Sequence, residues 1–487
     1  MRNPGVRHFG VMLLSMVLCG TSFASTKQQP VTVPQLSVFS DGSLQQTAAQ
    51  TAALATWWKQ FHDAQLQSLI EQAIAGNLDV RVARARLQES RATLGNTKAS
   101  QQLPTINMDG TYTRSRTSAD NPQVLTLGGT TTTVPYVYNS YQAYFDASYE
   151  VDIFGGVRNS VRAARADAES SADSLRDTLV STLAEVAKDY IQLREYQEQL
   201  RIAHSQENSQ QDTLHITEVR SKAGLVSDLD VANARASLAS TQTNVPQLES
   251  KIEQVKHAIA VLVGKTPKEL DAELSGAREI PSAANEIPAG LPSELLRRRP
   301  DVRAAENDVK AAAARVGVQV AKLFPTISLT AEYGGQSGSS ISNLTSSAAR
   351  FYSIGPTIQW GLLNYPALKT NIRVYKAKRD EKVLTYQKTV LKAFQDVEDS
   401  LTAYDKEKQR QQLLQNQVAQ YQRVYDLALA KYTRGLTNFL DVLEAQRSLY
   451  SAQDSLAQSQ ATVQTNLVSF YKALGGGWIG NELTIGR

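Results

Sequence analysis

The sequence is short of cysteine, of long apolar runs and of unbalanced charge. Cys19 is the only cysteine among 487 residues, so no disulfide framework is available. No stretch after residue 24 reaches the roughly 18 consecutive apolar residues of a membrane helix, and any passage through a membrane must therefore use strands. The 51 basic and 47 acidic residues nearly cancel, which gives no reason to expect a nucleic-acid partner.

Sequence signatures of catalysis and cofactor binding are also missing. Gly264-Lys265-Thr266 ends like a phosphate-binding loop, but Ile259 stands where that loop requires glycine. No nucleophile motif is present. Four histidines are scattered without metal-ligand spacing, namely His62, His204, His215 and His257. The sequence thus predicts a protein that is not an enzyme, with no catalytic residue, cofactor or metal site.

Residues 1–24 have the pattern of a secretory signal peptide. Two arginines precede an apolar run, and small residues at the end of the segment form a cleavage site. Cys19 lies in this segment and is the candidate lipidation site, although Leu18 precedes it where glycine or alanine is usual. The alternative is that Cys19 is an apolar signal residue that is removed by cleavage. Residues 25–56 are largely polar and predict an irregular N-terminal arm.

One short pattern occurs twice at a fixed distance. The segment 224–231 (GLVSDLDV) is matched 211 positions later by the segment 435–442 (GLTNFLDV). In each copy a glycine ends one helical pattern, and a small polar residue before Leu-Asp starts the next. We therefore expect residues 222–230 and 433–441 to be the tips of two helical hairpins.

The same distance relates the helices around the tips. Apolar residues at 4-3-4-3 spacing predict coiled-coil packing in both halves. They are Leu179, Leu183, Val186, Tyr190 and Leu193, matched by Val390, Phe394, Val397, Leu401 and Tyr404. An internal duplication of roughly 200 residues explains these matches. The predicted domains are repeat 1 (57–263), a linker (264–292), repeat 2 (293–475) and a C-terminal tail (476–487).

Alternation of apolar and polar residues predicts two strands in each repeat. The strands are expected at 105–114, 141–151, 326–334 and 351–361, with a polar loop over about 115–139. One apolar, aromatic face and one polar face suit a strand between lipid and water, although a half-buried soluble sheet alternates in the same way. Four strands cannot close a membrane barrel, because the smallest have about eight. Several copies of the chain must then share one barrel.

Each half is also predicted to hold one helix of about 65 residues, on the order of 100 Å long, with two shorter helices beside it. These segments are 157–221 with 78–99 and 229–263 in repeat 1, and 365–432 with 301–323 and 440–474 in repeat 2. The only tight basic run, Arg297-Arg298-Arg299, is interpreted as a solvated helix end before Pro300.

Several short motifs occur together: Trp57-Trp58-x-x-Phe61-x-Asp63, Leu103-Pro104, Asp152-Ile153-Phe154-Gly155, Leu295-x-Arg297-Arg298-Arg299-Pro300-Asp301 and Tyr432-x-x-Gly435. With them the chain resembles the TolC-like outer-membrane factors of tripartite efflux pumps, most closely the OprM/NodT-type branch, from residue 57 to about 474. The resemblance implies an α+β membrane protein of a Gram-negative bacterium. In it a homotrimer forms a twelve-stranded outer-membrane β-barrel that continues into a long periplasmic α-helical coiled-coil barrel. It also implies an inner-membrane RND transporter and a periplasmic adaptor (membrane fusion) protein.

The resemblance also implies a gate at the periplasmic tips, formed by Tyr432, Asp441 and Glu444. Three-fold symmetry would turn each carboxylate into a ring that narrows the opening and selects by charge. Thr437 stands where TolC itself carries a latch arginine, which puts a latch through that position in doubt. Adaptor contact is expected at the tips, through Gly224, Leu225, Asp230, Gly435 and Leu436. For Asp230, a charge at a helix N-terminus is an equal alternative.

Three functions remain open from the sequence. The first is a passive export duct for drugs or other small molecules in an RND-type efflux system. The second is the same duct serving a type I protein secretion system. The third is a structural coiled coil that spans the envelope and conducts nothing. The alternating strands with aromatic faces favour a duct, and the sequence contains no information on what is transported.

Overall fold

The computed structural model describes residues 54–118, 124–127, 130–133, 137–283 and 298–478. The predicted signal segment with Cys19 and most of the N-terminal arm lie outside the described residues. So do residues 284–292 of the linker and 479–487 of the tail. Among the helices in the described ranges, none combines the length and the apolar character needed to cross a membrane.

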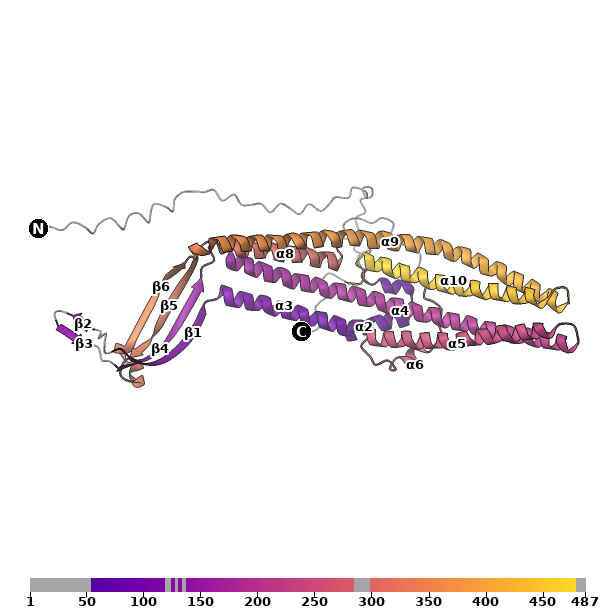
Figure 1. Cartoon of the computed structure of the whole chain (residues 1–487), viewed down its shortest axis with the longest axis horizontal. Helices are drawn as coiled ribbons and strands as arrows, with labels where there is room; N and C mark the ends of the chain where they lie inside the picture. Colours follow the sequence, from indigo (N-terminus) through magenta and orange to yellow (C-terminus); the bar gives the residue numbers. More distant parts are fainter. Residues whose placement is uncertain (1–53, 119–123, 128–129, 134–136, 284–297, 479–487) are drawn as a thin grey trace. The chain divides into compact units, whose positions relative to one another are not determined.

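Two helical hairpins make up most of the described chain (Figure 1). The long helix α4 (Gly156–Lys222) returns as α5 (Asp228–Leu262), and the long helix α9 (Tyr365–Thr433) returns as α10 (Phe439–Ala473). The helix α3 (Leu78–Gln102) packs beside α4, whereas α8 (Pro300–Ala321) packs against both α4 and α9. The shorter elements are η2 (Trp57–Phe61), α2 (Ala64–Gly76), α3 (Leu78–Gln102), α6 (Asp271–Leu274), α8 (Pro300–Ala321), η3 (Ile341–Thr345), η4 (Ser347–Ala349) and η5 (Leu362–Asn364).

The 4-3-4-3 spacing of apolar residues determines which face of each long helix is buried. On α4, Leu183, Val186 and Leu193 are completely buried. On α9, Val397 and Tyr404 are buried at the positions that correspond to Val186 and Leu193. A narrow apolar seam of this kind favours helices that lie nearly parallel along their length, because each seam residue inserts between residues of the neighbouring helix.

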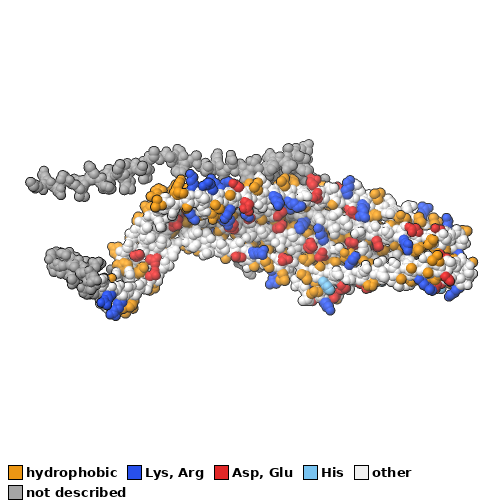
Figure 2. Space-filling view, in the orientation of Figure 1, with side chains coloured by type: hydrophobic (Ala, Val, Ile, Leu, Met, Phe, Trp, Pro, Cys, Tyr) orange, Lys and Arg blue, Asp and Glu red, His pale blue; other side chains and the backbone are white. Residues whose placement is uncertain are grey.

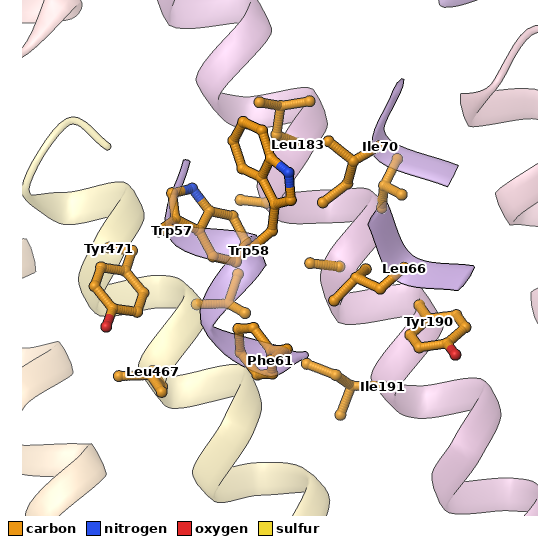
Figure 3. Packing of buried hydrophobic residues seen from close by; sticks show 14 of the residues in the cluster. Trp57, Trp58, Phe61, Leu66, Ile70, Leu183, Tyr190, Ile191, Leu467 and Tyr471 are labelled. Atoms are coloured by element: carbon orange, nitrogen blue, oxygen red, sulfur yellow. The ribbon is translucent and has the colours of Figure 1, made fainter. Parts of the chain in front are cut away.

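The largest hydrophobic cluster joins the beginning of the described chain to its end (Figure 3). Trp57 stacks on Tyr471 of α10 with the ring centroids 5.7 Å apart, and the edges of Trp58 and Phe61 approach the same indole. Leu66 and Ile70 of α2 belong to the same cluster and face side chains of α4 such as Ile191. Since buried aromatic rings remove about 150–250 Å² each from water, this cluster stabilises the contact between the two halves of the described chain.

The four predicted strands form one antiparallel sheet in the order β1–β4–β5–β6. The strands are β1 (Thr105–Arg116), β4 (Val137–Glu150), β5 (Thr326–Ser337) and β6 (Arg350–Gln359). The central pair, β4 and β5, joins the two halves of the chain, with Phe145 opposite Tyr333 and Asp146 opposite Glu332. β1 and β6 are the two edges of the sheet.

The register places apolar side chains in rows that run across the whole sheet. One row is Met108, Phe145, Tyr333 and Tyr352, and all four side chains are exposed. The neighbouring row on the opposite face is Asn107, Asp146, Glu332 and Ser353. A large exposed apolar face marks a surface that contacts lipid or protein.

Exposed apolar side chains also gather where β6 passes into α9 (Figure 2). Trp360, Leu362, Leu363 and Tyr365 follow one another within six positions, and all are exposed. The Trp360 indole N–H donates a hydrogen bond to the backbone oxygen of Leu323 at 3.2 Å, which fixes the ring at this junction. Tryptophan and tyrosine favour the boundary between lipid and water, because the ring is apolar and its edge is polar.

Two sequence interpretations are wrong. The region expected to be a polar loop contains a small antiparallel hairpin, β2 (Val124–Leu127) with β3 (Thr130–Thr133). The β-branched threonines of β3 favour an extended strand, which explains the difference. Arg299 is not a solvated helix end, since only 9 % of it is exposed. Its guanidinium pairs with Asp301 at 2.8 Å and Asp396 at 3.1 Å.

Candidate functional site

The two hairpin tips have the same backbone turn. The N–H of Leu225 donates to the carbonyl of Arg220 at 2.9 Å, and the N–H of Leu436 donates to Lys431 at 2.9 Å. The glycine before each leucine has a positive φ, 71° at Gly224 and 74° at Gly435. This is the glycine-dependent ending that satisfies the last carbonyls of a helix. The two glycines are therefore required by the backbone.

Polar side chains after the turns cap the first turn of each returning helix. Asp230 accepts hydrogen bonds from the backbone N–H and the hydroxyl of Ser227, both at 3.1 Å. The backbone N–H of Asp441 donates to the side chain of Asn438 at 3.1 Å, and its carboxylate accepts from the Thr437 hydroxyl. Ser227 with Asp230, and Asn438, thus cap the two helices, and Asp441 places a negative charge in the first turn of α10, where the helix dipole favours it.

Asp441 and Glu444 are exposed on α10. They are three residues apart and so lie on one face of the helix. The intervening Val442 and Leu443 are buried in a small hydrophobic cluster with Phe439. The side that faces the other helices is therefore apolar, and the two carboxylates point away from it.

Tyr432 lies inside the contact between the two hairpins, with only 1 % of its surface exposed. Its hydroxyl donates to Thr217 of α4 at 3.2 Å, and its ring meets Phe439 edge-on with centroids 5.8 Å apart. Ala234 of α5 belongs to the same cluster. Of the three predicted gate residues, the structure thus packs Tyr432 against the first hairpin and leaves the two carboxylates exposed.

Arg220 connects the hairpins and was not identified from the sequence. Its Nη1 donates to the backbone carbonyls of Tyr432 at 2.7 Å and Thr433 at 3.2 Å, and its guanidinium lies 4.8 Å from the centre of the Tyr432 ring. A cation is favourable there, because the last carbonyls of α9 carry partial negative charge. In the sequence, Arg220 is recognisable only as a basic residue in the last turn of α4. That position predicts an interaction with the end of α4 itself and not with α9.

Replacing Arg220 by alanine is expected to loosen the second tip. The variant loses two charge-assisted hydrogen bonds and a cation–π contact, which together contribute about 2–3 kcal/mol. We expect amide hydrogen exchange across residues 430–438 to accelerate at least about tenfold. Hydrogen exchange with mass spectrometry on detergent-solubilised protein measures this. Lys222→Ala removes an exposed cation two residues away and should leave the exchange unchanged; equal acceleration in both variants would contradict the role of Arg220.

The ends of the tips expose large apolar side chains. Leu225 is 66 % exposed and Leu436 is 72 % exposed. Leu229 and Leu440, which belong to the repeated pattern, are also exposed. Each tip thus carries two exposed leucines, and exposed apolar side chains of this size mark candidate contact surfaces.

Comparison with known proteins gives a consistent result. The family model described as "Outer membrane efflux protein" matches residues 69–265 and again 291–476. A toluene efflux pump outer membrane protein, TtgC of Pseudomonas putida, is 32% identical over 440 residues, 88% of this chain and 87% of that protein. A pyoverdine export outer membrane protein, OpmQ of Pseudomonas aeruginosa, is 32% identical over 434 residues, 88% of this chain and 89% of that protein. The solved outer-membrane channel OprN is similar with a TM-score of 0.80 and 35% identity, over 87% of this chain and 93% of that one.

Proposed function

Because this chain belongs to the outer membrane efflux protein family, we propose that it forms the exit duct of a tripartite RND-type pump. It is an outer-membrane efflux protein of the Gram-negative type and not an enzyme. In the proposed role it passively conducts drugs or other small molecules from periplasm to exterior. An inner-membrane transporter supplies the energy, and a periplasmic adaptor joins the two.

The sheet carries this proposal. β1 and β6 are edges, and the Met108–Tyr352 row is apolar and exposed. A single chain in lipid would leave the backbone groups of both edge strands without hydrogen-bond partners, which is costly there. In water it would expose the apolar row and two strand edges, which favours association with other chains. Three copies joined edge to edge supply twelve strands, pair β1 of one copy with β6 of the next and turn the apolar rows toward lipid. The exposed aromatic junction at Trp360 then lies at the membrane boundary.

The duplication fits the same assembly. The family model matches twice, once in each half, and each half contributes two strands of the four-stranded sheet and one helical hairpin. Three copies therefore place six similar hairpins around one axis. The proposed helical barrel continues the path of the strand barrel, with repeat 1 and repeat 2 hairpins alternating around it.

The tips are the proposed gate and the proposed docking site. Three copies of Asp441 and Glu444 form carboxylate rings, and the exposed leucines at the tips face the adaptor. An adaptor that binds the open arrangement more tightly shifts the equilibrium toward it. Within each copy, Arg220 and Tyr432 tie the two hairpins to each other, so that displacing one hairpin displaces the other.

The test uses the chain purified in detergent. We expect a trimer by mass measurement in detergent and discrete single-channel currents in planar bilayers.

Disulfide cross-linking tests the proposed pairing of β1 with β6 of the next copy. Introduced cysteine pairs can be used because the only native cysteine is Cys19. Thr111→Cys on β1, combined with single cysteines along β6, should cross-link neighbouring copies at one register. The control combines Thr111→Cys with Ser148→Cys on β4. Ser148 pairs with Thr105 and not with Thr111, so this combination should not cross-link. A monomer without conductance would instead support a structural coiled coil.

The chain does not determine the cargo. Two relatives at the same identity are named for toluene efflux and for pyoverdine export. This supports the proposal that the transporter selects what is exported, and that the duct selects only by size and by the charge of its narrowest ring.

A further inference from the structure

The short helix α6 lies in the linker between the repeats and is held firmly in place. Leu270 and Leu274 are completely buried in the main core. Three side chains of α2 and α4 donate hydrogen bonds to backbone carbonyls around α6: Gln65 to Glu273 at 2.5 Å, Arg194 to Gly276 at 2.7 Å and Gln197 to Leu274 at 3.1 Å. The backbone that carries Asp271 is thereby fixed relative to α4.

Three potential metal ligands meet beside this helix. Glu253 and His257 are four residues apart on α5 and so project from the same face. Asp271 approaches from α6, and one ligand atom from each residue lies within 4.8 Å of the other two. The sequence predicted no metal site, because the third ligand comes from the linker.

Asp271 supplies a second, independent observation. Its Oδ1 atom is buried and has no hydrogen-bond partner among the described residues. A buried carboxylate oxygen without a partner is costly, and a bound cation removes that cost. Glu253 accepts a hydrogen bond from Lys256 through Oε1 at 2.7 Å, which orients the carboxylate and leaves its other oxygen for a second interaction.

We propose that Glu253, His257 and Asp271 bind one divalent transition-metal ion of the Zn²⁺ class. The imidazole nitrogen favours such an ion over Mg²⁺ or Ca²⁺, which prefer oxygen ligands only. Two carboxylates balance the two positive charges, and three protein ligands leave one position for water. Ligand atoms of a tetrahedral Zn²⁺ site lie about 3.3 Å apart, so side-chain rotation closes the site while both helices keep their places. The bound ion joins the linker to α5.

The experiment uses untagged full-length protein in detergent, treated with EDTA and dialysed. Titration with ZnCl₂ in a calorimeter should give one ion per chain, and Co²⁺ should give the visible absorption of a low-symmetry site. An excess of Mg²⁺ or Ca²⁺ should not compete. His257→Ala and Asp271→Asn should each weaken Zn²⁺ binding at least about 100-fold, since losing even an outer partner of a ligand costs about 10–100-fold.

His215→Ala is the matched control, because His215 is exposed on α4 away from the cluster and should bind Zn²⁺ like the parent protein. Glu253→Gln, at an exposed position, repeats the test if Asp271→Asn does not fold. Absence of Zn²⁺ binding, or equal losses in the His215 and His257 variants, overturns the proposal. Transport is not measured, so this failure leaves the proposed duct unaffected.

Discussion

Replacing Asp441 and Glu444 together by alanine is expected to raise the open fraction of the duct about tenfold. In the proposed trimer each carboxylate occurs three times around the narrowest opening. If every copy loses about 0.5 kcal/mol of contact with its neighbour, three copies shift the closed-to-open equilibrium about tenfold. The wider, less negative opening should also lose preference for cations. Single-channel recording in planar bilayers measures both conductance and ion selectivity.

Two controls distinguish the effect of the carboxylate rings on conductance from the effect of losing Asp441 in the first turn of α10. Asp230→Ala removes the equivalent aspartate from the first hairpin and should change conductance little. Asp441→Asn can keep the hydrogen bond from Thr437 while removing the charge, and should change selectivity more than conductance. An unchanged conductance in the double variant would contradict the proposed gate positions. So would an equal increase in Asp230→Ala.

The tips were predictable from the sequence because their chemistry is local. A glycine with positive φ and an aspartate at a helix N-terminus act within a few residues, so a repeated segment of eight residues contains the whole turn. The alternation in the strands and the seam on α4 are local in the same way. Each depends only on which residues of one element face the same side.

The contacts between distant segments were not predictable. Arg220 and Tyr432 are 212 positions apart, and Arg299 and Asp396 are 97 apart. A basic residue near a helix end has the same local pattern whether it is solvated or buried against another helix. For this reason sequence patterns do not show that Arg299 is buried, that Arg220 contacts the end of α9, or that Tyr432 lies between the hairpins. Asp271 and His257 are likewise brought together by the fold, and their separation in the sequence does not indicate the contact.

The largest loss of stability is expected from Arg194→Ala. Arg194 is completely buried where α4 meets α2 and the linker. Its Nη1 donates to Gln197 at 2.5 Å and Gly276 at 2.7 Å, and its Nη2 donates to Gln65 at 2.5 Å. The guanidinium also lies 4.7 Å from the centre of the Tyr190 ring. Alanine leaves these acceptors buried without a donor and opens a cavity.

Tyr190 links this arginine to Asp63 through two hydrogen bonds. Its hydroxyl accepts from Arg194 at 3.2 Å and donates to Asp63 at 2.7 Å. Burial, together with the hydrogen bond to Asp63, raises the pKa of Tyr190 to about 12. The phenol therefore stays protonated at neutral pH and can donate to Asp63 while it accepts from Arg194. Loss of Arg194 removes the donor to the Tyr190 hydroxyl, which then keeps only its hydrogen bond to Asp63.

We expect Arg194→Ala to reduce the free energy of unfolding by about 3–5 kcal/mol. Arg194→Lys should recover only a small part, because one ammonium group cannot reach acceptors on α2 and the linker at the same time. Arg201→Ala is the matched control on the same helix: its exposed ion pair with Glu198 at 2.6 Å should contribute at most about 1 kcal/mol. Thermal unfolding by circular dichroism, at one protein concentration and in one detergent, ranks the three variants. Similar midpoints for Arg194→Ala and Arg201→Ala would show that the linker is held by its buried leucines alone.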